Sequence, residues 1–304
     1  MTPREQTVFN AIINCPSRAK ENNPSDPCYE IINYQRNYIS KKGRGTIQQP
    51  NPQARRQVPE PWNGDLANTS YLILASNPAY VPDEVFPNRD TNWASWADFG
   101  DGSLWTNKDC EDFFEGRLGK AICPRNGQLY FDLAANTVLS TDYHSNRFFR
   151  NKVQNNYWIT YDALCDAISP YYSRGSFSFA ITDLVHCKSG MQIGVSKACK
   201  ACIQHTRNIL DLFTKNGLKN HSVLLIGSVP KDYLEKLFIN YSFIEKPRPV
   251  GSFLDSKKNT TEFVYEQIMS IDGISVSVYF NIPAPSGMNR SRCPVTINGK
   301  TISW

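Results

Sequence analysis

Ser76 and Asn77 are the first residues whose position suggests chemistry, because they follow a short apolar run and precede Pro78. The run, Tyr71–Leu74, lacks the apolar–polar alternation of a half-exposed strand, which predicts a strand buried on both faces. Pro78 has no backbone N–H and disfavours helix at Asn77, so the chain must turn there. Open α/β sheets bind ligands at the carboxyl ends of such strands. A plain strand-to-loop turn is the alternative, since Asn-Pro is common in turns.

The nine cysteines are a second group of residues that could take part in chemistry. The N-terminal sequence Met-Thr-Pro-Arg-Glu-Gln lacks the charged and apolar blocks of a secretion signal. No apolar run reaches the about 18 residues that predict a membrane span. We therefore expect a cytoplasmic protein with no membrane partner, in which the cysteines are thiols or metal ligands and not disulfides.

The elements that would position these residues alternate between helices and strands. Helical spacing of apolar residues predicts helices over 4–14, 161–168 and 197–216, the last ended by Gly217, and a further helix beginning at Pro230. Apolar runs predict strands over 71–76, 177–185 and 223–226, and Asp272-Gly273 predicts a hairpin between strands over 264–269 and 274–280. This alternation predicts an α/β sandwich with a mostly parallel sheet.

The 304 residues suffice for one large domain with extensions. We predict an N-terminal helix and basic extension over 1–60 and a main domain over 61–304. The stretch 79–140 is poorly periodic and rich in aromatic residues, and loops this long usually carry function. The net charge is only +5, but the segments 31–58 and 283–304 contain no acidic residue. They indicate a polyanionic partner or, alternatively, solvated basic loops.

Four short segments resemble motifs of the uracil-DNA glycosylase superfamily and occur in the order found there. Residues 75–79, Ala-Ser-Asn-Pro-Ala, resemble Gly-x-Asn-Pro-Gly of the mismatch-specific branch, and residues 143–149 resemble its Asn-Arg-Phe-Trp segment. Residues 181–187, Ile-Thr-Asp-Leu-Val-His-Cys, resemble Ile-Thr-Asn-Val-Val-Lys-Cys of the iron–sulfur branch, and residues 285–290 resemble its Pro-Ser-Gly-Leu-Ser-Arg loop. The resemblance covers roughly residues 60–295 without 79–140. It implies a three-layer sandwich with a short central, mostly parallel sheet.

Four positions besides Asn77 are candidates for contacts with the base. Base excision passes through a sugar cation and an anionic leaving base, so it needs a positioned water and hydrogen bonds to the base. Asn77 would orient that water and not deprotonate it, because an amide does not titrate near neutrality. The candidate base-binding residues are Ser76, Asp183, Tyr143 and Phe99. Tyr143 is the first candidate for stacking on the flipped base, and a core aromatic is its alternative reading.

The resemblance also implies that residues 286–290 bind DNA. Met288, at the tip, would wedge into the base stack and fill the vacated space. Ser286, Gly287 and Arg290 would contact phosphates through a hydroxyl, a backbone N–H and a guanidinium, and Asn289 belongs to the same loop. The alternative is an ordinary exposed loop.

A metal centre follows from the same resemblance. The iron–sulfur branch has two ligands placed like Cys187 and Cys202, one after a strand and one on the next helix, and two more near its N-terminus. Cys15 and Cys28 are the N-terminal pair here, although their spacing is wider than in the family. Cys199 forms Cys-x-x-Cys with Cys202 and is an alternative ligand. Four thiolates suit a structural [4Fe–4S] cluster and also zinc, and unligated buried thiols are the third alternative.

Two departures from the family bear on the substrate. Asp183 stands where the iron–sulfur branch has an Asn that reads uracil, and an ionised carboxylate only accepts hydrogen bonds. It would oppose the O4 carbonyl of uracil and match the N4 amine of cytosine. Ala284 replaces a polar residue of the last motif. Both favour a cytosine-derived or bulky modified base, whereas a helix-capping or structural carboxylate is the alternative for Asp183.

We therefore expect a monofunctional DNA glycosylase that flips and excises a modified or deaminated pyrimidine and leaves an abasic site. Excision of a hypermodified cytosine from phage DNA in antiviral defence is favoured, with repair of uracil in DNA as the alternative. A non-catalytic DNA-binding module of the same fold is the alternative from another class. Neither GxGxxG nor GxxxxGK[ST] occurs, so we expect no nucleotide cofactor. The expected partner is DNA, bound by a monomer.

Overall fold

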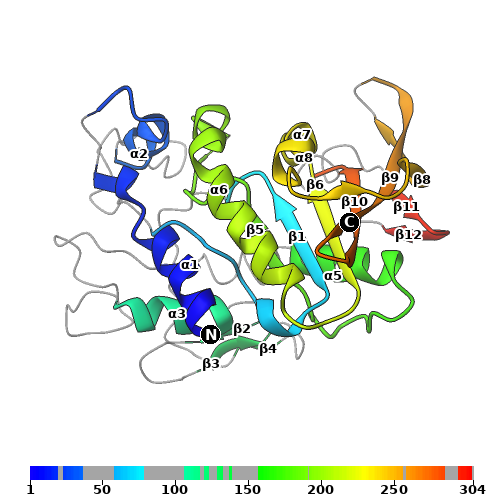
Figure 1. Ribbon diagram of the computed structural model, residues 1–304, viewed down its shortest axis with the longest axis horizontal. Helices are drawn as coiled ribbons and strands as arrows, with labels where there is room; N and C mark the ends of the chain where they lie inside the picture. Colours follow the sequence, from blue (N-terminus) through cyan, green and yellow to red (C-terminus); the bar gives the residue numbers. More distant parts are fainter. Residues whose placement is uncertain are drawn as a thin grey trace. The chain divides into compact units, whose positions relative to one another are not determined.

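The computed structural model describes residues 1–19, 23–36, 58–78, 106–116, 120–122, 129–132, 137–138, 157–190, 192–255, 258–284 and 294–302 (Figure 1). The chain divides into two compact units. Unit 1 comprises Met1–Pro61, Asn77–Lys152 and Asp183–His205, and unit 2 comprises Trp62–Ser76, Val153–Thr182 and Thr206–Trp304. Within the described ranges, no helix is both long and apolar enough to cross a bilayer.

Unit 2 is built around a nine-stranded sheet in which the strand order is β12-β11-β8-β9-β10-β6-β1-β5, with β7 paired to β9. The strands are β1 (Tyr71–Ala75), β5 (Ala180–Asp183), β6 (His221–Ile226), β7 (Ser242–Phe243), β8 (Arg248–Asp255), β9 (Thr260–Ile271), β10 (Ile274–Ile282), β11 (Val295–Ile297) and β12 (Lys300–Ile302). Only Asp183, the last residue of β5, belongs to unit 1.

The centre of this sheet is parallel and apolar. β10, β6 and β1 are parallel neighbours, with Val223 of β6 between Leu72 of β1 and Val278 of β10. All three side chains are fully buried, as expected for strands covered on both faces. The parallel pairing brings the carboxyl ends of β1, β6 and β10 to one edge of the sheet.

The chain has a mixed α/β fold, but the predicted short, mostly parallel sheet is not confirmed. The β8–β9–β10 meander and the β11–β12 hairpin are antiparallel and make most of the sheet antiparallel. The predicted hairpin at Asp272-Gly273 is confirmed: both residues have positive φ, 51° and 78°, as a tight two-residue turn requires. The sheet grows beyond the predicted size because β8, β11 and β12 extend this hairpin.

The helices of unit 2 lie close to the predicted ones. α5 (Tyr157–Ile168) covers the predicted 161–168, and α7 (Ser228–Asp232) begins two residues before Pro230 and is followed by α8 (Leu234–Leu237). Asn298 and Lys300 donate to the carbonyls of Ala167 and Asp166, which hold the β11–β12 hairpin on α5. α6 (Val195–Thr214) ends before Gly217, which has a φ of 88°.

Unit 1 contains the N-terminal helices and the amino-terminal half of α6. α1 (Pro3–Ile13) starts with a capping box formed by Thr2 and Glu5, and it is followed by the 3-10 helix η1 (Pro16–Ala19) and by α2 (Tyr29–Arg36). Within the stretch 79–140 the structure describes α3 (Asn107–Gly116) and a small sheet of β2 (Lys120–Ile122), β3 (Leu129–Asp132) and β4 (Thr137–Val138). Phe9 packs edge-on against Phe114, which joins α1 to α3.

Candidate functional site

Asn77 lies directly after β1, and its carboxamide is held in one orientation. Its Nδ2 donates to the carbonyl oxygens of Pro78, at 3.1 Å, and Ser189, at 3.2 Å. Because a carbonyl oxygen only accepts, these two bonds decide which end of the carboxamide is the nitrogen. Oδ1 is therefore turned away from both carbonyls. An amide held in this way can accept a hydrogen bond from a water molecule at Oδ1, although it cannot remove the proton.

The segments that follow β1 and β5 are neighbours in unit 1. Ser189 N–H donates to Pro78 O at 3.0 Å, in addition to the bond from Asn77. Asp183, at the end of β5, is only 5% exposed. Two of the predicted site residues, Asn77 and Asp183, thus lie on neighbouring segments of unit 1. Ser76 directly precedes Asn77 and is the last residue of the unit 2 segment Trp62–Ser76.

A buried ion pair stands next to these segments. Lys188 Nζ lies 3.8 Å from Glu60 Oε2, and both side chains are almost completely buried. Glu60 N–H donates to His186 O at 2.8 Å, and His186 Nδ1 lies 2.9 Å from Glu60 O. Burial lowers the pKa of His186 to about 4, so the ring is neutral and carries its proton on Nδ1. The sequence analysis missed Lys188 and Glu60, because no spacing rule relates residues so far apart in the chain.

Four of the nine cysteines gather in unit 1. The thiols of Cys187 and Cys202 hydrogen-bond to Cys28 and lower its pKa far below the usual range. The same hydrogen bonds, together with burial, raise the pKa of Cys187 and Cys202. Cys15 is close enough for its charge to interact with that of Cys28, and burial raises its pKa. These are the four cysteines that the resemblance implies as ligands.

Local structure explains how Cys28 reaches this group. Cys28 precedes α2, where its N–H donates to Asp26 Oδ1 at 2.9 Å and its carbonyl accepts from Ile31 and Ile32. The positive end of a helix favours a thiolate at this position. α2 in turn lies tightly against the start of α6, where a methyl group on Gly194 would come within 2.9 Å of Ile31. Close packing of α2 thus brings the N-terminal cysteines to the segment that carries Cys187 and Cys202.

The gathered thiols suit a metal centre in type, number and burial. In the part of the chain that the structure describes, no three His, Cys, Asp or Glu side chains are arranged as a formed metal-ligand group. Thiol ligands must lose their protons to bind a metal ion. Cys199 is fully buried on α6, three positions before Cys202. It stays the alternative to Cys202 as a ligand.

The sequence matches no model of a known protein family and none of the curated proteins with which it was compared. Function must therefore be argued from the site itself.

The other predicted base and DNA contacts fall outside the described residues. These are Phe99, Tyr143, Ser286, Gly287, Met288, Asn289 and Arg290.

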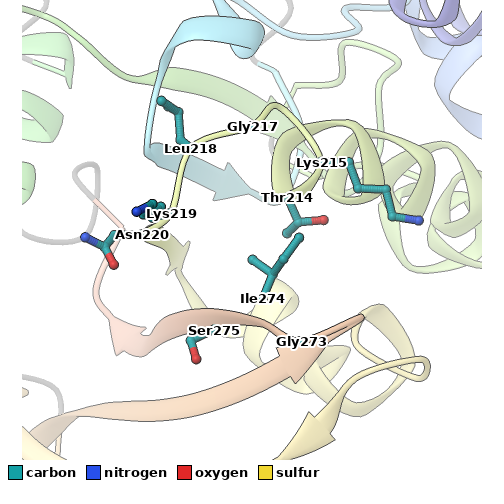
Figure 2. A pocket seen from close by; sticks show the side chains of 9 residues that line it. All are labelled: Thr214, Lys215, Gly217, Leu218, Lys219, Asn220, Gly273, Ile274 and Ser275. Atoms are coloured by element: carbon teal, nitrogen blue, oxygen red, sulfur yellow. The ribbon is translucent and has the colours of Figure 1, made fainter.

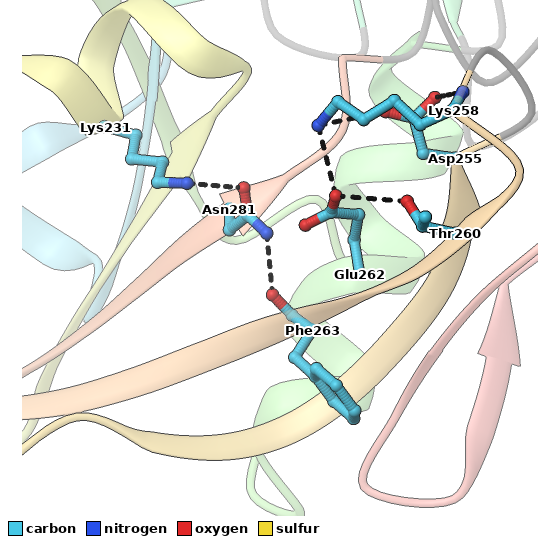
Figure 3. Close-up of polar contacts among 7 residues, drawn as sticks. All are labelled: Lys231, Asp255, Lys258, Thr260, Glu262, Phe263 and Asn281. Atoms are coloured by element: carbon cyan, nitrogen blue, oxygen red, sulfur yellow. Dashed lines mark hydrogen bonds and ion pairs between the residues drawn. The ribbon is translucent and has the colours of Figure 1, made fainter.

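The chain leading toward residues 286–290 is described as far as Ala284. The β10–β6 register shifts between Tyr279 and Ile282, and Asn281 between them has a φ of 61°. Figure 3 shows Asn281 held from both ends: Lys231 Nζ donates to its Oδ1, and its Nδ2 donates to Phe263 O. Such a bulge redirects a strand where it leaves a sheet.

A shallow cavity of about 580 Å³ lies elsewhere in unit 2 (Figure 2). It is lined by residues after α6, including Lys215 and Lys219, and by Ile274 beside the β9–β10 turn. Lys215 forms ion pairs with Asp211 and Asp272. The cavity is at the amino ends of β6 and β10, the edge opposite to their carboxyl ends, and none of the predicted site residues lines it.

Proposed function

We propose that this protein is a monofunctional DNA glycosylase that flips a modified or deaminated pyrimidine out of DNA and hydrolyses its N-glycosyl bond. The observation that carries the proposal is the gathering of Cys15, Cys28, Cys187 and Cys202. The cysteines that come together are the same four that the resemblance, which rests mainly on other motifs, implies as ligands. The test is the formation of abasic sites in DNA by the purified protein, which a binding module of the same fold would not produce.

The orientation of Asn77 supports the same proposal. Hydrolysis of the glycosyl bond needs a water molecule held on one side of the sugar while negative charge develops on the leaving base. The carboxamide of Asn77 would hold that water through Oδ1, and the bonds from Nδ2 to two backbone carbonyls fix which way the carboxamide points. The base would then leave as an anion, and the product would be an abasic site.

The finer fold assignment belongs to this proposal. A three-layer sandwich of the uracil-DNA glycosylase type places its reactive residues at the carboxyl ends of parallel strands. The parallel pairing of β10, β6 and β1 supports such an arrangement. The antiparallel strands β8, β9, β11 and β12 would then be additions at one side of that sheet.

We further propose that the four cysteines hold a [4Fe–4S] cluster, with zinc as the second choice. The cluster would serve as a structural cross-link. Through its four cysteines it would tie residues 15–28 to the segment after β5 and to α6. The partner would be DNA, bound by a cytoplasmic monomer. The acid-free segments 31–58 and 283–304 support a polyanionic partner.

The buried carboxylate of Asp183 points to a cytosine derivative as the excised base. A buried carboxylate accepts hydrogen bonds and opposes a carbonyl oxygen, so it fits the N4 amine of cytosine better than O4 of uracil. Excision of such a modified base from phage DNA would serve antiviral defence. This assignment can be tested separately from the glycosylase activity itself.

Replacing Asp183 with asparagine should shift base choice toward uracil by roughly ten- to a hundredfold, the effect of one mismatched buried polar pair. The measurement is single-turnover release from matched duplexes that carry uracil, hydroxymethylcytosine or its glucosylated form. Asp162→Asn is the matched control, because Asp162 is an equally buried aspartate that holds Tyr172 and the backbone of Gly175. If the ratio of the release rates of the different bases is the same in Asp183→Asn as in the wild type, Asp183 is a structural residue.

A further inference from the structure

The peptide segment that holds Asn77 is itself held from another side by α2. Gln35 Nε2 donates to Lys188 O at 2.7 Å, and both residues are almost completely buried. One residue further along, Ser189 O accepts from Asn77 Nδ2. Gln35 and Asn77 thus bind the carbonyl oxygens of consecutive residues, and the position of the second carbonyl depends on that of the first.

This segment makes further contacts with α2 and with the residues that follow it. A methyl group on Gly190 would lie 2.1 Å from the hydroxyl oxygen of Tyr34, so the ring of Tyr34 stands directly against the backbone there. Ser189 Oγ donates to Ile193 O at 2.6 Å, and Ile193 N–H donates to Gly190 O. The segment therefore contacts both α2 and the carboxamide of Asn77.

We propose that Gln35 is a positioning residue for Asn77. By fixing Lys188 O, it places Ser189 O where that oxygen receives Nδ2 of Asn77, and so it sets the direction in which Oδ1 points. Its catalytic consequence rests on the proposed glycosylase function, whereas its effect on the Asn77 side chain does not.

Gln35→Leu tests the proposal by removing the donor while keeping a side chain of similar size. The single-turnover rate of base release should fall by roughly ten- to a hundredfold, because a small misplacement of a reacting group costs that much. The dissociation constant for DNA should stay within about twofold, since the side chain of Gln35 is almost completely buried. Gln267→Leu is the matched control, because Gln267 also donates from Nε2 to a backbone carbonyl, that of Glu245 in unit 2. Equal losses of rate in both variants would overturn the proposal.

A second measurement needs no activity. In protein labelled with nitrogen-15 at asparagine, the signals of Asn77 Nδ2 are assigned by their loss in Asn77→Ala. Their hydrogen exchange with water should be roughly three- to tenfold faster in Gln35→Leu than in the wild type, as expected for weakening one hydrogen bond. Unchanged exchange would overturn the positioning role. If the wild type releases no base from any DNA but the exchange responds, the glycosylase proposal fails and the positioning role stands.

Gly190→Ala provides a second route to the same segment if Gln35→Leu does not fold. The backbone of Gly190 does not have a positive φ, and the three atoms nearest to an added methyl group all belong to Tyr34. The variant should displace the segment and reproduce the faster exchange. Gly190→Ala combined with Tyr34→Leu, which removes the hydroxyl end of the ring, should restore most of the wild-type exchange rate. The proposal would also be contradicted if exchange at Asn77 Nδ2 in Gly190→Ala were as slow as in the wild type, or if the double variant exchanged as fast as Gly190→Ala.

Discussion

Replacing Asn77 with alanine is expected to slow single-turnover base release by roughly a hundred- to a thousandfold. Removing one group that orients or stabilises the transition state typically costs this much. The variant keeps the backbone turn at Pro78 but has no oxygen to direct the attacking water. Binding of DNA should change little, because the loss concerns the chemical step. The measurement is the rate of base release with enzyme in excess over DNA, together with the dissociation constant.

Asn216→Ala is the matched control for this result. Asn216 Nδ2 also donates to two backbone carbonyls, those of Leu66 and Thr69. It belongs to unit 2, so its loss should lower the free energy of unfolding without a specific effect on the rate. A rate in Asn77→Ala within about threefold of that in Asn216→Ala would exclude Asn77 from the chemistry.

Replacing Cys28 with alanine is expected to remove most of the bound metal and to lower the free energy of unfolding by about 4 kcal/mol or more. Losses of this size are typical when a structural metal site is destroyed. Cys28 is central to the group, since the thiols of both Cys187 and Cys202 hydrogen-bond to it. The measurements are iron and zinc per protein chain after anaerobic purification, the visible absorption of the cluster, and denaturant unfolding.

Cys199→Ala is the control that decides between the two candidate ligands on α6. Cys199 is as deeply buried as Cys202, so its replacement should cost about 1–2 kcal/mol of stability, the usual range for a core substitution. Metal content should remain at the wild-type level. If Cys199→Ala loses as much metal as Cys28→Ala, Cys199 is a ligand. Wild-type protein that contains neither iron nor zinc would contradict the proposed metal centre.

The local elements of the fold were predictable from the sequence. Periodicity and caps placed α1, α5, α6, β1 and β6 within a few residues of their observed bounds. The strand predicted over 177–185 is shorter, Ala180–Asp183, because Asp162 accepts from the backbone of Gly175 and Phe177 and holds those residues in a loop.

The pairing of distant strands was not predictable in the same way. β8 contains Pro249 and Gly251, which weaken a strand pattern, and it is a strand because β9 and β11 pair with it. β11 and β12 have three residues each and carry too short a pattern to detect. The sheet is mostly antiparallel for these reasons, although the hairpin of β9 and β10 was visible in the sequence.

The candidate site shows the same division. Asn77, Asp183 and the four cysteines could be selected from the sequence, because a motif consists only of residue types and their order along the chain. The orientation of Asn77 depends on Ser189 and, behind it, on Gln35, which are remote in sequence. Likewise, the buried pair of Glu60 and Lys188 has no sequence signature. Tertiary contacts of this kind appear only once the chain is folded.

The most direct test of the glycosylase proposal is a balance between released bases and abasic sites. Wild-type protein and Asn77→Ala are incubated with DNA containing unmodified, deaminated or phage-modified pyrimidines, the free bases are identified by mass spectrometry, and abasic sites are counted in the same samples. We predict one abasic site for each base released by the wild type, from at least one of these DNAs, and roughly a hundredfold less of both products in the same time with Asn77→Ala. Tight binding of all the DNAs with no free base and no abasic site would contradict the account and make the protein a DNA-binding module.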